Sequence, residues 1–162
     1  MMDLRMITPD DADATRKIYN TEVMTSTATF DLRPRDRTEH ERWVEAHMGA
    51  HPAVVAVEGA VITGFAAISP YRSRPAYATT VEDSVYVAAG WRGRGLGGAL
   101  LADVIRRATE HGFHTVMARV EATNTASVRI HERCGFDVVG TERQIGRKFG
   151  RWLDVTVLQK LL

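Results

Sequence analysis

The sequence predicts a mixed α/β or α+β fold with one central sheet. The chain has 162 residues, of which 44% are hydrophobic, a length that fills one substantial core but not two. Apolar, β-branched runs typical of strands alternate with stretches of helical periodicity on both sides of a glycine-rich segment at residues 93–98. We therefore expect residues 1–162 to form a single domain.

The first elements are expected to be a short strand and a helix. The strand is LRMI, residues 4–7, and the helix follows over residues 8–23. Thr8 can cap this helix, Pro9 suits its first position, and acidic residues crowd its positive end. The polar, proline-interrupted segment at residues 24–36 is expected to be a loop.

A second helix and a hairpin complete the first half of the chain. The helix is expected over residues 37–48, with Thr38 as its cap and Glu41 as the capping-box partner. Two apolar, β-branched runs, residues 53–59 and 60–71, meet at a Glu-Gly pair. That pattern is typical of an antiparallel hairpin.

The second half alternates strands and helices before ending in two strands. Glycines mark the ends of both helices, Gly112 after the first and Gly135 after the second. The expected elements are a strand at 79–87, a helix with the apolar face Leu101, Val104, Ile105 and Ala108, a strand at 114–120, a short helix at 124–136, and two long strands within 136–162 joined around 146–150.

Composition excludes several classes of protein. Lys plus Arg number 21 and Asp plus Glu number 20, so nothing indicates affinity for nucleic acid or a membrane surface. The N-terminus has no long apolar run, so we expect no signal peptide, and no segment approaches the ~20 apolar residues of a membrane span. Cys134 is the only cysteine, which fits a reducing cytoplasm.

The glycine-rich segment matches two different phosphate-binding patterns. Gly93, Gly95 and Gly98 spell G-x-G-x-x-G, the dinucleotide fingerprint. Arg92, Gly95 and Gly97 spell R-x-x-G-x-G. No Lys followed by Ser or Thr completes a Walker loop, so that alternative is excluded.

Position along the chain argues against a dinucleotide. Glu121 lies where a ribose-binding acid belongs, which favours that fold. However, five residues separate Val87 at the end of the strand from Gly93, and about eighty residues of other elements precede the motif. We therefore interpret the loop as free backbone N–H groups and a helix N-terminus that bind a pyrophosphate. The alternative is a glycine-rich turn that only starts a helix.

At this point the sequence resembles the GNAT N-acetyltransferases. WRGRGLGGALL, residues 91–101, looks like the loop with which that family binds the pyrophosphate of acyl-coenzyme A. A second motif is similar to the family's N-x-x-[AS]-x-x-[apolar]-[Tyr]-x-x-x-G-F helix, with histidine in the tyrosine slot. Its matching positions are Asn124, Ser127, Ile130, His131, Gly135 and Phe136.

The resemblance narrows to the phosphinothricin and methionine sulfoximine acetyltransferases. TVEDSVYV, SVRIHERCGF and GRKFGRWLDVTVLQ are similar to segments of those enzymes, and IYNTEVMTSTATFDLRP and PYRSRPAY look like their substrate-side segments. The resemblance implies a GNAT-like fold, with a mostly antiparallel sheet of about seven strands and flanking helices. It also implies acetyl-CoA as co-substrate, the α-amine of a small amino-acid analogue as acceptor, and a homodimer.

The same resemblance implies which residues hold the coenzyme. The glycine loop would anchor the pyrophosphate, and the preceding strand would pair with the pantetheine amides as a peptide pairs with a sheet edge. A helix further on would contact the pantetheine arm and the phosphates. The expected coenzyme residues are Val85, Tyr86, Val87, Arg92, Gly93, Arg94, Gly95, Leu96, Gly97, Gly98, Asn124, Ser127 and Arg133.

Two residues are candidates for proton transfer. Glu82 lies on the strand that would carry the thioester, and a partly buried carboxylate has a raised pKa suited to a general base; Asp83 points to the opposite face of a regular strand. His131 occupies the slot from which the family's tyrosine protonates the leaving thiolate. The alternatives are a solvated strand carboxylate for Glu82 and a coenzyme contact or structural role for His131.

The segment just upstream of the Glu82 strand is expected to contribute to the substrate pocket. Guanidinium groups suit a carboxylate and a second polar head, although the YRSRPAY segment could equally be a solvated loop. The expected lining residues are Phe30, Tyr71, Arg72, Arg74, Tyr77 and Thr80. The segment 152–154 is expected to shape the final hairpin and a dimer contact.

Other signals are set aside. His47 and His51 are four residues apart, but Gly49 lies between them and no second ligand pair supports zinc, so we expect no metal. Cys134 has no activating neighbour and is expected to be a small core residue. Two rival functions stay open: the same fold acetylating another amine, such as a protein N-terminus, polyamine or antibiotic, and a non-catalytic acyl-CoA-binding module.

Overall fold

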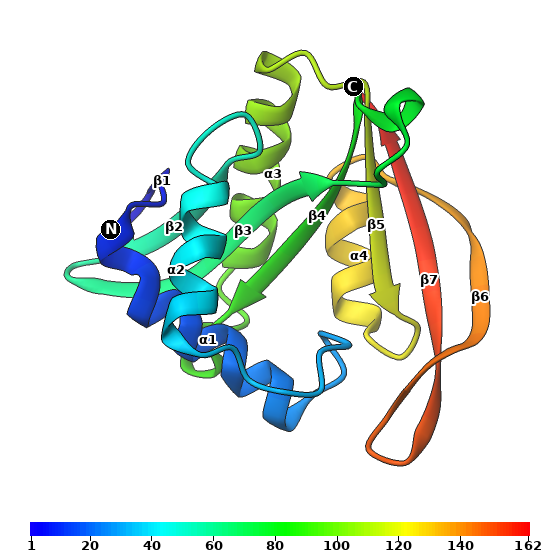
Figure 1. Ribbon diagram of the computed structural model, residues 1–162, viewed down its shortest axis with the longest axis horizontal. Coiled ribbons are helices and arrows are strands. Elements are labelled where there is room, and N and C mark those ends of the chain that lie inside the picture. The colour runs from blue at the N-terminus through cyan, green and yellow to red at the C-terminus, as the bar shows by residue number, and fades with distance from the viewer.

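The computed structural model describes all residues from Met1 to Leu162 and contains one seven-stranded sheet with four α-helices (Figure 1). The elements in chain order are β1 (Met2–Met6), α1 (Ala12–Thr25), α2 (Arg37–Ala46), β2 (Ala53–Glu58), β3 (Val61–Pro70), β4 (Thr80–Val87), α3 (Leu96–Glu110), β5 (Thr115–Glu121), α4 (Thr125–Arg133), β6 (Asp137–Lys148) and β7 (Arg151–Leu161).

The strands are ordered β1-β2-β3-β4-β5-β7-β6, and every neighbouring pair is antiparallel except β4 and β5. This confirms the predicted mixed, mostly antiparallel sheet of seven strands. Helices cover both faces of the sheet: α1 and α2 lie on one face, and α3 and α4 on the other (Figure 1).

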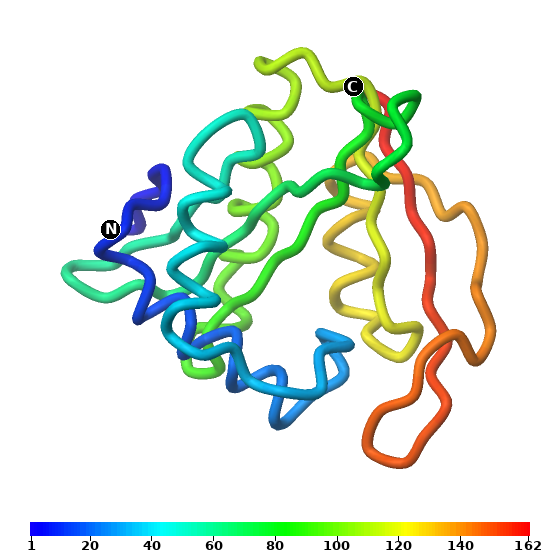
Figure 2. The backbone as a smooth tube through the Cα atoms, in the orientation of Figure 1, coloured from blue at the N-terminus to red at the C-terminus, as the bar shows by residue number.

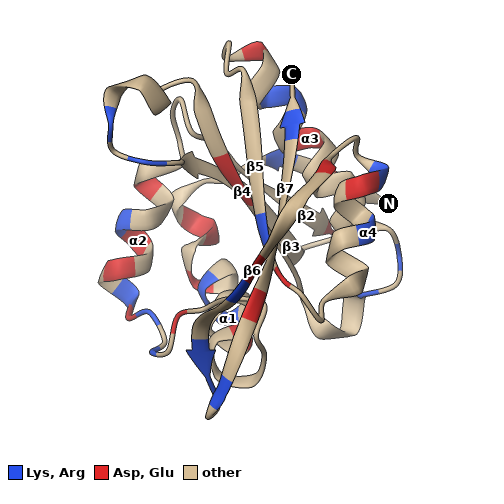
Figure 3. Cartoon of the chain, turned by 90° about the vertical axis from the view of Figure 1, so that its right-hand side faces the viewer, with Lys and Arg blue, Asp and Glu red and all other residues tan.

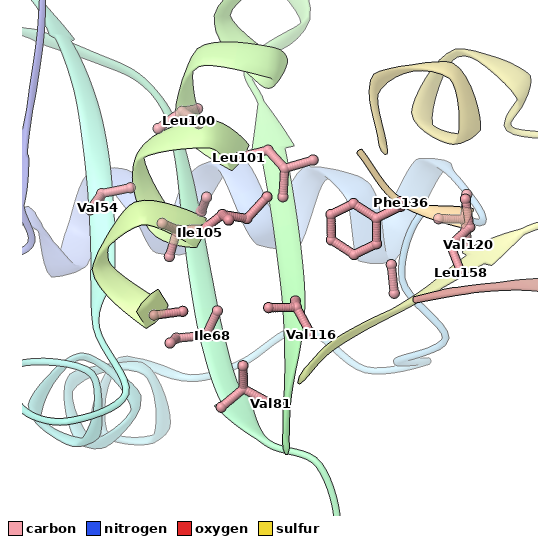
Figure 4. Close-up of a cluster of buried hydrophobic side chains, with 14 of the residues drawn as sticks. Val54, Ile68, Val81, Leu100, Leu101, Ile105, Val116, Val120, Phe136 and Leu158 are labelled. Carbon is pink, nitrogen blue, oxygen red and sulfur yellow. The ribbon is translucent and has the colours of Figure 1, made fainter. Parts of the chain in front are cut away.

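The larger core lies beneath α3 and α4. Periodic apolar residues of α3 pack on alternate residues of β2, β3, β4 and β5, as Figure 4 shows for Leu101, Ile68, Val81 and Val116. The smaller core joins α1 and α2 to the opposite face through the intervening strand residues, including Phe65. Strand residues are therefore buried on both faces, which explains why their segments read as continuous apolar runs.

Hydrogen bonding between β4 and β5 stops early. The pair is in register only from Thr80 opposite Thr115 to Glu82 opposite Met117. Beyond that point β4 continues to pair with β3 alone and β5 with β7 alone, and the backbone trace in Figure 2 shows the two strands spreading apart. One side of residues 83–87 is consequently left without a strand partner.

The predicted helix starts need correction. Asp36, not Thr38, caps α2: it accepts from Glu39 N at 2.8 Å, and its own N–H donates to Glu39 Oε2 at 2.9 Å. Both D-x-x-E and T-x-x-E fit a capping box, and the chain uses the earlier one, since Glu41 pairs with Arg37 instead. Thr8 starts a short 3₁₀ turn at Pro9–Asp11, and α1 begins only after it.

The predicted helix ends need smaller corrections. Helix α2 stops at Ala46, two residues before the predicted end, and α1 runs to Thr25, into the segment predicted as loop. Gly112 and Gly135 do follow helices, at φ of +86° and +89°, where glycine is favoured. The final strands meet at residues 149–150, inside the predicted turn.

Candidate active site

The glycine loop presents unpaired donors at the start of α3. The backbone N–H groups of residues 95–98 donate to no acceptor within the chain, and the first helical bond runs from Ala99 N to Gly95 O at 3.1 Å. Gly93 and Gly95 have φ of +76° and +80°, and the space beside both is open. Orphan donors reinforced by the helix dipole suit a pyrophosphate.

Not every glycine of the loop serves the same purpose. A Cβ on Gly97 would lie 3.2 Å from Ile130 Cδ1, so this glycine lets α3 approach α4 closely. Gly98 has open space and its carbonyl faces the Cys134 thiol at 3.9 Å. Leu96 is buried in the core. The R-x-x-G-x-G pattern therefore combines donor exposure with helix packing.

The two arginines of the loop point in different directions. Arg92 forms an ion pair with Glu22 of α1, and its Nε donates to Val87 O at 3.2 Å. Its guanidinium is thus turned back onto α1 and β4. Arg94 lies with its guanidinium 4.7 Å from the centroid of the Trp91 ring. The sequence predicted both side chains beside the pyrophosphate, and it missed Glu22, which lies 70 residues before Arg92.

Strand β4 carries the predicted pantetheine edge. Tyr86 faces α1 and packs 5.3 Å from both Tyr19 and Phe65, measured between ring centroids. Val85 and Val87 face the larger core on the opposite side. Their backbone lies in the segment that no longer pairs with β5. This edge lies next to the start of α3, where a Cβ on Gly97 would be 3.9 Å from Val87 Cγ2.

Helix α4 holds its predicted residues through hydrogen bonds within the chain. The Asn124 side chain caps the helix by accepting from Ser127 N at 3.2 Å. The Ser127 carbonyl accepts from His131 Nδ1 at 2.8 Å. Arg133 is exposed near the C-terminal end of the helix, one turn from Arg129. Asn124 and Ser127 are therefore close together, whereas Arg133 lies at the far end.

His131 forms a buried ion pair with Asp83 of β4. Its Nε2 lies 3.0 Å from Asp83 Oδ1, and the two side chains are only 4% and 3% exposed. Both ring nitrogens face an oxygen, Ser127 O and the Asp83 carboxylate, and both donate when the ring is an imidazolium. Burial alone would lower the pKa of His131, but the hydrogen bonds and charge of Asp83 outweigh burial and raise that pKa. The sequence placed Asp83 on this face without predicting its partner.

Glu82 faces the opposite side of β4, at the last position paired with β5. It is partly buried, and burial raises the pKa of its carboxyl, although the nearby guanidinium groups of Arg119 and Arg72 oppose that rise. Arg119 on β5 places its Nε 4.0 Å from Glu82 Oε1, and its Nη1 pairs with Glu142 of β6. Sequence reasoning missed Arg119 and Glu142. Figure 3 shows acidic and basic segments on these strands.

The predicted substrate segment gathers two tyrosines around one arginine. The Tyr71 and Tyr77 rings are 5.6 Å apart and nearly perpendicular, and the Arg72 guanidinium lies 4.9 Å from the first ring and 5.7 Å from the second. The charge of Arg72 reaches Glu82. Arg74 is exposed, at the start of a 3₁₀ turn. Thr80 begins β4, two residues before Glu82.

The segment between α1 and α2 is fastened to β6. The Phe30 ring lies so close to Gly146 that a Cβ at that glycine would clash with the ring. Lys148, which is 3% exposed, donates from Nζ to Thr29 O at 2.8 Å. Two contacts from β6 thus hold the loop that carries Phe30, whose side chain remains 39% exposed.

Two other sequence signals have structural explanations. His47 is buried, with Nδ1 2.7 Å from Trp43 O and Nε2 2.9 Å from Ser69 Oγ, so both nitrogens are used. Burial raises the pKa of the Cys134 thiol, which disfavours a nucleophilic thiolate.

None of the helices has the length and apolar character that a membrane span needs.

One surface hollow lies away from Glu82. It has a volume of about 570 Å³ and lies between the α1–α2 loop and α2, where Arg35, Arg42 and Trp43 are among its lining residues. The converging chemical groups are instead at the divergence of β4 and β5. Charge and free donors decide what a site can do, so the candidate active site is at this divergence.

Comparison with known proteins identifies the family. Residues 15–136 match the acetyltransferase (GNAT) family. The L-methionine sulfoximine/L-methionine sulfone acetyltransferase of Salmonella typhimurium is 38% identical over 159 residues, which cover 98% of this chain and 93% of that protein. Phosphinothricin N-acetyltransferase of Streptomyces coelicolor is 41% identical over 149 residues, covering 90% of this chain and 87% of that protein.

Solved structures of similar proteins have the same fold. The structure of yncA from Salmonella typhimurium with its cofactor acetyl-CoA has a TM-score of 0.97 at 38% identity, covering 100% of this chain and 94% of that one. A phosphinothricin acetyltransferase from Sinorhizobium meliloti in complex with acetyl-CoA has a TM-score of 0.96 at 32% identity, covering 99% and 88%. The fold, the loop and these similarities lead to one conclusion: the chain is an enzyme that belongs to the GNAT family of acetyltransferases.

Proposed function

We propose that this enzyme transfers the acetyl group of acetyl-CoA to the α-amine of a small amino acid of the methionine sulfoximine, methionine sulfone or phosphinothricin type. One observation carries the proposal: Glu82, a partly buried carboxylate of raised pKa, lies where β4 and β5 part and has Arg72 nearby. A zwitterionic amino acid needs this combination of an acceptor for its ammonium and a guanidinium for its carboxylate.

The backbone supports the binding of acetyl-CoA. The free N–H groups of residues 95–98 and the open space beside Gly95 suit the pyrophosphate. Residues 85–87 offer a strand edge for the pantetheine amides, and a backbone N–H there would polarise the thioester carbonyl. The Asn124 amide nitrogen at the start of α4 is free to bond the pantetheine arm. Acetyl-CoA supplies the activated acyl group.

Glu82 is proposed as the general base. An α-ammonium must lose a proton before it can attack, and a carboxylate of raised pKa accepts that proton at neutral pH, directly or through water. His131 was the candidate for protonating the leaving thiolate. Both of its nitrogens are committed to Ser127 O and Asp83, which supports a role in positioning α4 against β4 more than direct proton donation.

Arg72 and its two tyrosines are proposed to select the substrate. The rings of Tyr71 and Tyr77 pack around the guanidinium, whose charge reaches Glu82. Phe30 would provide an apolar wall from the loop that β6 fastens. Arg74 would supply a second cation for a polar head such as a phosphinate or sulfoximine. A narrow pocket lined by these groups would fit a small amino acid better than a peptide or polyamine.

A homodimer is proposed as the working unit of this single-domain enzyme, in the cytoplasm. The β6–β7 hairpin forms the edge of the sheet and exposes large apolar side chains, which are characteristic of an interaction surface. Light scattering should give twice the chain mass. The exposed side chains are Val138, Val139, Ile145, Phe149 and Trp152.

Release of free thiol from acetyl-CoA tests the substrate. We expect turnover with methionine sulfoximine, methionine sulfone or phosphinothricin, and little with polyamines or peptide N-termini. No release with these three compounds, alongside release with another amine, would favour the rival acetyltransferase. No release with any amine, together with a thermal shift from acetyl-CoA, would favour a non-catalytic module. At 100 times its Kd, acetyl-CoA should stabilise the fold by ~2.7 kcal/mol.

A further inference from the structure

We propose that Glu142 is a positioning residue that holds the Arg119 guanidinium away from Glu82 and so preserves Glu82 as a base. The inference rests on the proposed function, in which Glu82 accepts the substrate proton. A carboxylate with a guanidinium within ~4–6 Å ordinarily has its pKa lowered by about 1–3 units, which would make it a poor base at neutral pH. Arg119 Nε already lies 4.0 Å from Glu82 Oε1, and a guanidinium turned fully onto Glu82 would lower that pKa further.

The strand register explains how the three residues meet. Glu82 of β4 is opposite Met117 of β5, so Arg119, two residues further along β5, lies on the same face of the sheet. Arg119 is opposite Val157 of β7, and Glu142 of β6 is opposite Val155. Glu142 therefore reaches Arg119 diagonally across β7, from the side opposite Glu82.

The Arg119 guanidinium lies closer to Glu142 than to Glu82. Its Nη1 forms the closer ion pair, with Glu142 Oε1, whereas Nε lies 4.0 Å from Glu82 Oε1, at the limit of an ion pair and beyond hydrogen-bond distance. The side chains of Arg119, Glu82 and Glu142 are 31%, 38% and 37% exposed, so each can move. Removing Glu142 would leave Glu82 as the nearest acid for Arg119.

An irregularity in β6 keeps Glu142 in place. The register with β7 shifts between Glu142 and Gly146, and Gln144 within that shift has φ of +51°. The Gln144 N–H donates to Asp154 Oδ1 at 2.7 Å, which braces the bulge against β7. Bulges of this kind re-aim side chains next to functional sites.

Some of the charges around Glu82 raise its pKa and others lower it. Burial raises the pKa of Glu82 most, and the negative charges of Asp83 on its own strand and Glu142 on β6 add to that rise. Arg119 on β5 and Arg72 from the β3–β4 connection lower it. Since Glu142 both repels the Glu82 carboxylate and retains Arg119, its loss should shift the balance towards a lower pKa.

The test is a direct titration of Glu82 by ¹³C NMR of protein labelled at the glutamate carboxyl, with the resonance assigned by its loss in Glu82→Gln. Glu142→Gln should lower the pKa of Glu82 by about 1 unit, and Arg119→Gln should raise it by about 1 unit. In the Arg119→Gln background, Glu142→Gln should shift the pKa less than half as much. Glu110→Gln, which removes a surface partner of Arg106 on α3, should change nothing.

Two outcomes would overturn the positioning role: an unmoved pKa of Glu82 in Glu142→Gln, or an equal shift with and without Arg119. The acid limb of kcat/KM, measured at saturating acetyl-CoA, separates this result from the proposed function. If the pKa of Glu82 measured by NMR shifts and the pKa of the acid limb of kcat/KM shifts with it, both proposals stand. If the NMR pKa moves and the limb does not, positioning stands and the role of Glu82 as base fails.

Discussion

Replacing Asp83 with asparagine should destabilise the fold in a strongly pH-dependent way. The carboxylate is 3% exposed and its partner His131 is 4% exposed, and both ring nitrogens lie within hydrogen-bond distance of an oxygen. Removing one partner of a buried pair costs about 3–5 kcal/mol, a large share of a total stability of about 5–15 kcal/mol. The asparagine side chain would keep an acceptor near Nε2 but would no longer neutralise the imidazolium.

The sign of the pH dependence follows from the pKa of His131. That pKa is raised above its ordinary value of 6.5 in the folded protein. The pair's contribution to stability is therefore fully present below about pH 6.5 and is lost as pH rises through the folded-state pKa. At pH 6 the Asp83→Asn protein should be about 3 kcal/mol less stable than wild type. Above the folded-state pKa of His131, where the ring is neutral, the difference should fall to about 1 kcal/mol.

Urea unfolding followed by far-ultraviolet circular dichroism, at a series of pH values from pH 6 upwards, provides the measurement. Other titrating groups, such as the buried His40, are present in both proteins and largely cancel in the difference. A loss of stability that does not shrink as pH rises, or that grows, would refute the assignment of His131 as a buried imidazolium held by Asp83.

Three further predictions concern His40, Gly95 and Gly146. Burial lowers the pKa of His40 to about 4, so the free energy of unfolding should fall by up to about 3 kcal/mol between pH 6.5 and pH 4. In His40→Gln the melting temperature should depend less on pH across that range. An unchanged pH dependence of the melting temperature would count against a buried, neutral His40. Gly95→Ala should cost about 1–2 kcal/mol at φ of +80° and weaken acetyl-CoA binding by calorimetry; undiminished affinity would remove this glycine from the site. Gly146→Val should displace Phe30 and raise KM for the amino acid more than for acetyl-CoA; equal effects on both would argue against Phe30 as a substrate wall.

Local features were predictable from the sequence because single residues determine them. Glycines at 93 and 95 signal backbone conformations that other residues resist, so the loop could be located before any fold was known. The apolar periodicity of α3 located its buried face in the same way. The start of α2 was ambiguous, because two overlapping capping boxes fit and only the structure shows which is used.

Pairings between distant residues were not predictable. Asp83 and His131 are 48 residues apart, and Arg92 and Glu22 are 70 apart. Each pair depends on which strand lies next to which helix, and the spacing of residues within one segment does not determine those neighbours. Alternation along β4 did place Asp83 on the face opposite Glu82, so a histidine on the covering helix was a searchable partner once the topology was known.

The most direct measurement compares wild type with Glu82→Gln for thiol release from acetyl-CoA, with methionine sulfoximine as acceptor, alongside the Kd of acetyl-CoA. Loss of a general base should lower kcat by about 10²–10⁴-fold, while the Kd stays within about twofold because Glu82 faces away from α3 and α4. Wild-type turnover in Glu82→Gln would contradict the role of Glu82 as the base at the divergence of β4 and β5.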